Sequence, residues 1–185
     1  MPAGTHGCPA WFDLKHKRFE GDATSCLAPD DIHVLESAPR FLIRRVTSAQ
    51  MFFDVCVVHG PCAADAHCDI RDFWKMMTTR LNKHSRSSPS TLCFLDANVN
   101  LRSCSAQAIL HRAHCEDFLV NTELALVHGH PDRPPLVPYL SVTCPQGVQN
   151  DFVATRGPAT SPCSFAAAKE SLTTTTRGMD HILVS

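Results

Sequence analysis

A carboxylate and a carboxamide two residues apart follow a short apolar run in the middle of the chain. Residues 91–95 (TLCFL) have the composition of a buried strand, and Asp96 and Asn98 come directly after them. In an extended chain, residues two apart project to the same side, so we expect these side chains to converge at the carboxyl end of a central strand. Open α/β sheets bind ligands at such ends, and an Asp beside an amide suits a phosphate or a hydrated Mg²⁺. An ordinary Asp/Asn turn after a strand is the alternative interpretation.

Three further polar sets lie next to strand-like runs. His59 follows residues 51–58 (MFFDVCVV) and precedes Gly-Pro, which ends the strand. Asp151 opens the run 151–155, and Asp180 with His181 precedes residues 182–184. Taken singly, these are a turn histidine, the first residue of a strand and a surface pair. If the strands share one sheet, however, His59 lies at the same edge as Asp96 and Asn98.

Apolar periodicity predicts the elements that position these residues. Residues 32–35, 41–46 and 51–58 read as strands, and the short polar gap before residue 51 predicts an antiparallel hairpin. Residues 66–81 predict a helix, because apolar side chains recur at the spacing of one buried face: Ala66, Ile70, Phe73, Trp74, Met77 and Leu81. The polar run 82–90 is expected to be a loop. The order of strand, helix and strand indicates α/β layering.

The second half of the chain is less clearly patterned. Residues 99–113 read as an irregular loop, residues 114–122 as a short helix and residues 124–127 as a strand. His128 and His130 invite a zinc interpretation, but no Cys lies at ligand spacing nearby, which favours a surface loop.

Composition narrows the class of protein. A chain of 185 residues with 44% hydrophobic and 19% charged residues suits one compact domain. The formal net charge of −1 argues against binding nucleic acid mainly through overall charge, so any such contact must rest on a local basic patch.

The ten cysteines include no C-x-x-C pair, the start has no secretory signal pattern, and no apolar run is long enough to span a bilayer. We therefore expect an intracellular protein, nuclear or cytoplasmic, without membrane contact. The phosphate-binding loop, Rossmann and zincin motifs are absent.

In sequence order, the polar sets resemble the motifs of the endonuclease/exonuclease/phosphatase family, which includes DNase I and the abasic-site endonucleases. The family's strand leading into His or Tyr, any residue and Pro is similar to residues 57–61 (VVHGP), and its Gly-Asp-x-Asn to residues 95–98 (LDAN). Its Ile-Asp-aromatic-aliphatic motif is similar to residues 150–153 (NDFV). Its Ser-Asp-His motif is similar to residues 179–184 (MDHILV).

This resemblance implies a DNase I-like α/β fold, a sandwich of two mixed or antiparallel sheets flanked by helices. It covers residues 31–185, a partial endonuclease/exonuclease/phosphatase domain, and leaves residues 1–30 as a weakly patterned N-terminal segment. The chain looks most like the endonuclease domains of non-LTR retrotransposons, in an eroded copy that is incomplete at the N-terminus.

The resemblance also implies metal-dependent phosphodiester hydrolysis, and it favours DNA over RNA as the partner. Asp151 would orient His181, which with Asp180 prepares the attacking water. His59 would donate to the phosphate or protonate the leaving oxygen, while Asp96 and Asn98 hold the phosphate and nucleophile. Mg²⁺, or Mn²⁺ in its place, would neutralise charge with a carboxylate from Asp180.

Several positions depart from the family pattern. Gly4 stands where the family has a metal-binding Glu, Leu95 replaces a Gly, and residues 179 and 183 lack the family's Ser and Pro. Glycine cannot ligate a metal through a side chain. The alternative hypothesis is therefore a non-catalytic remnant that at most binds nucleic acid or protein.

Overall fold

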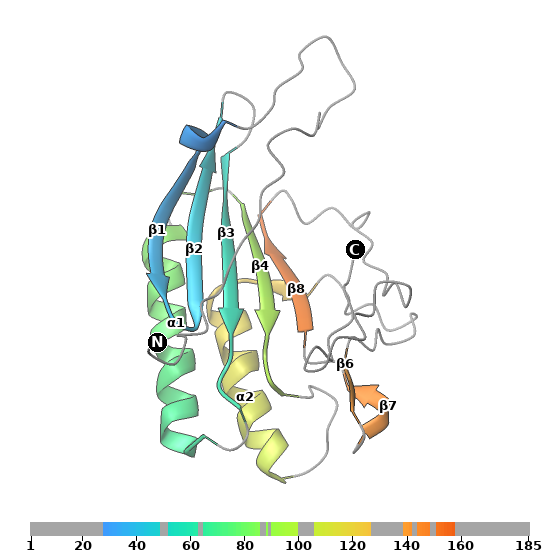
Figure 1. The fold of residues 1–185 in the computed structure, drawn as a ribbon. Helices are drawn as coiled ribbons and strands as arrows, with labels where there is room; N and C mark the ends of the chain where they lie inside the picture. The colour runs from blue at the N-terminus through green and yellow to red at the C-terminus, as the bar shows by residue number, and fades with distance from the viewer. Residues whose placement is uncertain are drawn as a thin grey trace, which may run out of the picture.

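A six-stranded mixed sheet with two helices on one face forms the body of the protein (Figure 1). The structure, a computed structural model, describes residues 28–48, 52–62, 65–85, 88, 90–99, 106–126, 139–141, 144–148 and 151–157. The elements in chain order are a 3₁₀ turn η1 (Pro29–Asp31), β1 (Ile32–Ala38), β2 (Phe41–Thr47), β3 (Phe52–His59), α1 (His67–Ser85), β4 (Thr91–Asp96), α2 (Ala106–Asn121), β5 (Ala125–Leu126), β6 (Tyr139–Ser141), β7 (Cys144–Val148) and β8 (Asp151–Arg156).

The strand order in the large sheet is β1-β2-β3-β4-β8-β5. Strands β1, β2 and β3 are joined as antiparallel neighbours, which confirms the predicted hairpin between the second and third strands. Strand β4 pairs parallel to β3, because helix α1 carries the chain from the end of one to the start of the other. Strands β8 and β5 add antiparallel neighbours beyond β4, and β6 with β7 forms a separate two-stranded sheet. The predicted α/β layering is confirmed.

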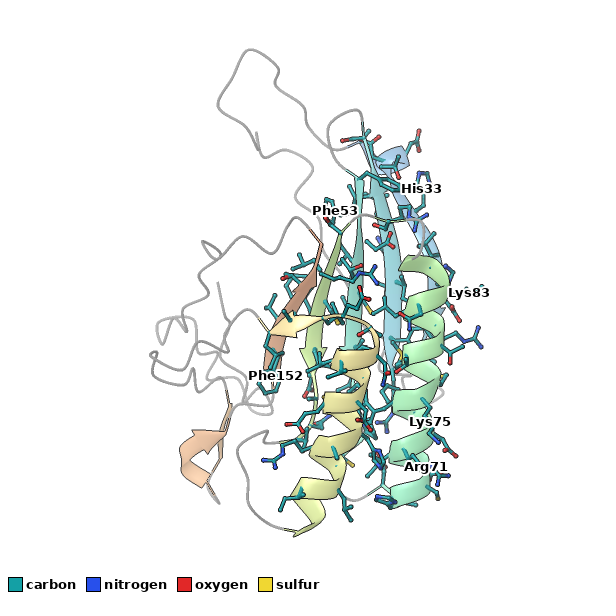
Figure 2. All side chains as sticks on the ribbon, turned by 180° about the vertical axis from the view of Figure 1, so that it is seen from behind. His33, Phe53, Arg71, Lys75, Lys83 and Phe152 are labelled. Carbon is teal, nitrogen blue, oxygen red and sulfur yellow. The ribbon has the colours of Figure 1, made fainter. Side chains whose placement is uncertain are left out.

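Both helices pack on the same face of the large sheet, where the main core lies (Figure 2). Helix α1 contributes Ile70, Trp74, Met77 and Leu81, the buried face that its periodicity predicts, although Ala66 is exposed and precedes the helix. The Trp74 ring lies 5.3 Å from that of Phe118 on α2. Alternate residues of β2, β3 and β4 complete this core from the sheet side.

Helix α1 runs through Ser85, so the prediction of a loop from residue 82 is wrong for its first four residues. Tertiary contacts hold this last turn. Glu36 accepts from Arg80 (Nη1 to Oε1, 2.8 Å) and meets His84 (Nε2 to Oε2, 3.0 Å). A register shift in β1 between Val34 and Glu36 pairs Glu36 with Ile43, which faces the helices.

Helix α2 begins at Ala106, so the prediction of an irregular loop through residue 113 is wrong from residue 106 onward. The apolar residues that would mark its first turns, Ile109 and Leu110, are 42% and 53% exposed, while His111 is buried at 2%. The helix therefore buries a polar side chain and exposes two apolar ones. This hides the 3.6-residue apolar periodicity by which a helix is recognised in a sequence.

His111 is also the least well satisfied polar side chain of this core. Neither of its ring nitrogens has a hydrogen-bond partner among the described residues. Burial lowers its pKa below the ordinary value of 6.5, and the neighbouring His114 and His67 lower it further against the opposing effect of Asp65.

Acidification is therefore expected to destabilise the fold through His111. Well above pH 6.5 the His111 ring is neutral in both the folded and the unfolded chain. As the pH falls below 6.5, the unfolded chain takes up the proton first, because the pKa is lowered in the folded state. The free energy of unfolding therefore falls until the pH passes that lowered pKa. Urea unfolding at pH 8 and pH 5 measures the loss. His111→Leu, which removes a buried unsatisfied group worth about 1–3 kcal/mol, should be at least as stable at pH 8 and lose less on acidification. An equal loss in both proteins would contradict this assignment.

No helix in the described part of the chain is both long and apolar enough to cross a membrane. Residues 1–27, 127–138 and 158–185 lie outside the described residues. The boundary predicted for the N-terminal segment, the loop predicted at His128 and His130, and the strand predicted at residues 182–184 stay predictions.

Candidate functional site

Three of the predicted site residues occupy one row across the sheet. His59 is the register partner of Asp96 on the parallel neighbour, and Asp96 is the partner of Asp151 on the next strand. Directly opposed residues project to the same face of a sheet, and for His59 and Asp96 this is the face away from the two helices. His59 ends β3, Asp96 ends β4 and Asp151 begins the antiparallel β8, so the row lies along one edge of the sheet.

The imidazole of His59 faces the carboxylate of Asp96. Nε2 of His59 lies 3.4 Å from Oδ2 of Asp96, and the two side chains are 47% and 20% exposed. The half-exposed His59 ring is accessible to a ligand, whereas the Asp96 carboxylate is more buried. A carboxylate in this position limits the rotation of the imidazole, which suits a ring that must be positioned for proton transfer.

The turn after β4 brings Asn98 close by a route that differs from the prediction. We expected Asp96 and Asn98 to converge because both lay in extended chain, but the strand ends at Asp96 and Asn98 has φ 49°, in the left-handed region. The Asn98 N–H donates to Oδ1 of Asp96 at 3.1 Å, an Asx turn. The turn interpretation therefore describes the backbone correctly. The Asp96 carboxylate is therefore joined to the backbone of Asn98, while the Asn98 side chain donates to the Gly60 carbonyl.

Gly60 joins the loop after β3 to the loop after β4. Its N–H donates to the Asp96 carbonyl at 2.7 Å, and its own carbonyl accepts from Nδ2 of Asn98 at 2.9 Å. A Cβ at position 60 would lie 2.8 Å from the Ala97 carbonyl oxygen and 3.0 Å from Cζ2 of Trp74. Glycine is therefore required here by close approach of backbone and ring.

Gly60→Ala is accordingly expected to destabilise the protein by about 1–3 kcal/mol, since the added methyl group has no space and the backbone on either side must move. Urea unfolding followed by circular dichroism measures this loss. Ala97→Gly is the control, because it changes the neighbouring loop without adding a methyl group. It shows how much stability is lost when that loop only becomes more flexible. A Gly60→Ala protein as stable as the wild type would show that the two loops are less closely packed than described.

Arg40 is a site residue that the sequence analysis did not identify. It lies in the turn between β1 and β2, where its carbonyl accepts from the His59 N–H at 2.8 Å. Its guanidinium donates to the Gly60 carbonyl through Nη1 at 3.1 Å and lies 3.4 Å from Oδ2 of Asp65 through Nη2. The side chain is 42% exposed, so it places a permanent positive charge beside the row. The hairpin register, which puts residue 40 next to residue 59, is the signal that could have revealed it.

The other predicted residues are only partly placed. The backbone of Asp151 lies in the row, but its side chain is outside the described set. Asp180 and His181 lie outside the described residues altogether. Only the register position of Asp151 is therefore described. That Asp151, Asp180 and His181 come together stays a prediction.

The described residues do not fit a bound Mg²⁺ by themselves. In the described part of the chain, no group of three or more His, Cys, Asp or Glu side chains is positioned to hold a metal ion. Asp96 supplies a described carboxylate of the row, and its Oδ1 already accepts from Asn98. Mg²⁺ in proteins uses one or two carboxylates with water and substrate phosphate, so Asp96 would supply one carboxylate and the remaining ligands would come from water, the phosphate or an acid outside the described side chains.

Solved structures of DNA-processing enzymes share this arrangement of elements. The 3′-phosphatase NExo from Neisseria, bound to a product DNA hairpin, superposes with a TM-score of 0.64 at 12% identity, over 85% of this chain and 70% of that one. The chain has a DNase I-like fold. The 3′-5′ exonuclease NExo from Neisseria meningitidis gives a TM-score of 0.61 at 14% identity, over 83% of this chain and 69% of that one.

An AP endonuclease from Archaeoglobus fulgidus gives a TM-score of 0.59 at 16% identity, over 78% of this chain and 63% of that one. The chain thus spans between about three fifths and seven tenths of these enzymes' lengths. At these identities the likeness defines the fold. No family model and no curated protein matches the chain.

Proposed function

We propose that the protein hydrolyses phosphate esters of nucleic acid, with DNA as the substrate class. The observation that carries this proposal is the row of His59, Asp96 and Asp151 along one edge of the sheet. Three solved structures with the same fold are a DNA 3′-phosphatase, an exonuclease and an AP endonuclease, and these names support the substrate class.

Hydrolysis at this row needs a water oxygen to attack phosphorus while the bond to the ester oxygen breaks. The water proton must leave to a base, and the departing oxygen must gain a proton. His59, held by Asp96, is proposed to donate to the phosphate or to the leaving oxygen. Asp151, with Asp180 and His181 beyond the described residues, is proposed to prepare the water. Asn98 and Asp96 are proposed to hold the phosphate and nucleophile in place.

Arg40 adds a charge that such a reaction uses. Its guanidinium lies at the same edge as His59 and is fixed by the Gly60 carbonyl and Asp65. A fixed cation stabilises the negative charge that spreads over the phosphate oxygens in the transition state. We propose Arg40 as a phosphate-binding residue. It also supplies part of the local positive charge that a chain of net charge −1 needs to bind DNA.

A divalent metal is expected to take part, with Mg²⁺ proposed and Mn²⁺ as its substitute. Asp180 is proposed as its protein carboxylate. Such an ion supplies charge neutralisation at the phosphate when bound. The proposed kinship with retrotransposon endonucleases rests on the sequence motifs around His59, Asp96 and Asp151.

A second candidate function is binding of nucleic acid or protein without hydrolysis. The observation in its favour is that, within the described ranges, no three potential metal ligands come together at the row or elsewhere. This alternative predicts that DNA binds and is released unchanged.

A panel of DNA substrates separates the two candidates. The purified full chain is incubated with supercoiled plasmid, a duplex containing an abasic site and a duplex ending in a 3′-phosphate, each with Mg²⁺, Mn²⁺ or EDTA. Metal-dependent cleavage of any member, abolished by EDTA, is the expected result and would identify the substrate. Saturable DNA binding without cleavage under all conditions would support the binding function. Neither binding nor cleavage by folded protein would overturn both.

A further inference from the structure

The outer face of helix α1 carries basic side chains at a regular spacing. Arg71, Lys75 and Lys83 are separated by four and eight residues, and Figure 2 shows them one above another along the helix. Thr79 fills the remaining position of the series, and all four side chains are exposed. These residues form a line that rises about 18 Å along the helix axis, the α1 basic line.

The two lysines of this line have no ion-pair partner among the described residues. Asp72, the acid that precedes them on the helix, already accepts from Arg71 (Nε to Oδ1, 2.9 Å). From residue 73 to its last residue, α1 contains no Asp or Glu. Lys75 and Lys83 therefore present their charges to solvent.

The acid that reaches α1 from the sheet is bound elsewhere. Glu36 of β1 accepts from Arg80 (Nη1 to Oε1, 2.8 Å) and meets His84 (Nε2 to Oε2, 3.0 Å). Its side chain is only 19% exposed, so it lies beneath these partners. The outer face of α1 thus keeps an excess of positive charge.

Charges spread along a line suit an extended anion better than a small one. A lysine that meets a nucleic-acid phosphate gains free energy by releasing condensed counterions, and each such contact adds to the salt dependence of binding. A chain of net charge −1 needs a local basic patch for this purpose, and the α1 basic line is such a patch. Contacts of this kind position a strand without reading its sequence.

The line and the site row lie on opposite sides of the sheet. His59 and Asp96 project from the face away from the helices, whereas the line is on the exposed side of a helix that packs against the other face. Arg40 connects the two regions, since it pairs with Asp65 just before α1 begins. Duplex DNA is stiff over about 150 base pairs and does not bend around such an edge, but a single strand does.

We propose that the α1 basic line binds the phosphate backbone of a single-stranded segment that extends from the nucleic acid at the row. This inference rests on the proposed function, which places nucleic acid there. It adds a preferred form of substrate, a duplex with a single-stranded extension. The extension gives additional contacts that a blunt duplex does not have.

Binding in EDTA tests the line without hydrolysis. Fluorescence anisotropy of the full chain is measured over a salt series with a blunt duplex and with the same duplex carrying an extension of about 12 nucleotides. The proteins are the wild type, Lys75→Gln, Lys83→Gln and the matched control Arg112→Gln. Arg112 is a basic residue of α2 whose Nε lies 3.5 Å from Glu116. The wild type should bind the extended duplex more tightly and with a steeper salt dependence.

Each lysine removed should reduce the slope of log K against log salt by about 0.7, the value for one phosphate contact of a single strand. The reduction should be confined to the extended duplex, and Lys75→Arg, which keeps the charge, should restore the wild-type slope. Arg112→Gln should keep that slope. Wild-type slopes in both lysine variants overturn the proposal. An equal reduction with the blunt duplex, or in Arg112→Gln, also overturns it.

Plasmid nicking separates this inference from the proposed function. Nicking by a wild type whose lysine variants keep the wild-type slope would remove the α1 basic line and leave hydrolysis at the row. Reduced slopes in the lysine variants of a protein that does not nick would support the line and exclude the hydrolysis.

Discussion

Asp54→Ala is expected to destabilise the folded protein by about 3–5 kcal/mol, because it leaves Arg45 without its partner in the protein interior. Asp54 is completely buried, and it accepts two hydrogen bonds from Arg45, Nε to Oδ1 at 2.8 Å and Nη2 to Oδ2 at 3.1 Å. Arg45 is 17% exposed and also donates to the His84 carbonyl at 2.9 Å. The pair thus fastens the sheet to the last turn of α1. Equilibrium unfolding in urea measures the loss.

The double variant Arg45→Met, Asp54→Leu is the matched control. Removing both charges also removes the desolvation that each one suffers, so replacing a buried ion pair with apolar residues is often close to neutral. We expect the double variant to recover most of the stability that Asp54→Ala loses. Full stability of the single variant would contradict the described pair. A double variant as unstable as the single would show that the His84 contact matters more than the charge pair.

Trp74→Ala is expected to cost a similar amount, about 3–5 kcal/mol, because a large buried side chain is replaced by a cavity. Trp74 is 2% exposed and contacts the rings of Phe73 and Phe118, with centroids 5.2 and 5.3 Å away. Its Cζ2 also lies 3.0 Å from the position that a Cβ of residue 60 would take, so the ring supports the loop next to His59. The same variant should therefore also disturb the site row.

Trp74→Phe separates these effects. The Nε1 of Trp74 is buried without a hydrogen-bond partner among the described residues, so phenylalanine removes an unsatisfied donor while keeping most of the ring volume. Unfolding in urea should show Trp74→Phe much closer to the wild type than Trp74→Ala. If the two variants lose equal stability, the indole edge at Gly60 carries more of the packing than the two ring contacts do.

The sequence alone was enough to predict the central β3-α1-β4 unit, because two unambiguous periods occur there. Alternation and β-branched residues mark the strands, and Ile70, Trp74, Met77 and Leu81 mark the buried face of the helix. The row of His59, Asp96 and Asp151 was foreseeable for the same reason, since polar residues that follow or begin strands meet at one edge once the strands pair.

The features that sequence analysis missed depend on contacts between distant parts of the chain. The last turn of α1 is held by Glu36 and Arg45, which are remote in sequence. The first half of α2 was missed because it buries His111 and exposes Leu110. Arg40 reaches the site only through the register of a hairpin. The left-handed conformation of Asn98 follows from its hydrogen bond to Asp96, which no apolar period reports.

The most direct test of the proposed site is the rate at which variants of its row nick supercoiled plasmid in Mg²⁺. Asp96→Asn and His59→Gln are compared with the wild type and with Asp72→Asn, a matched change at an exposed acid that pairs with Arg71 on the surface of α1. A positioned acid or base contributes about 10²–10⁴-fold, so each row variant should nick at least about a hundredfold more slowly while Asp72→Asn keeps the wild-type rate. Urea unfolding of each protein shows that the losses are not losses of fold. Row variants that nick as fast as the wild type would contradict the assignment of the chemistry to His59 and Asp96.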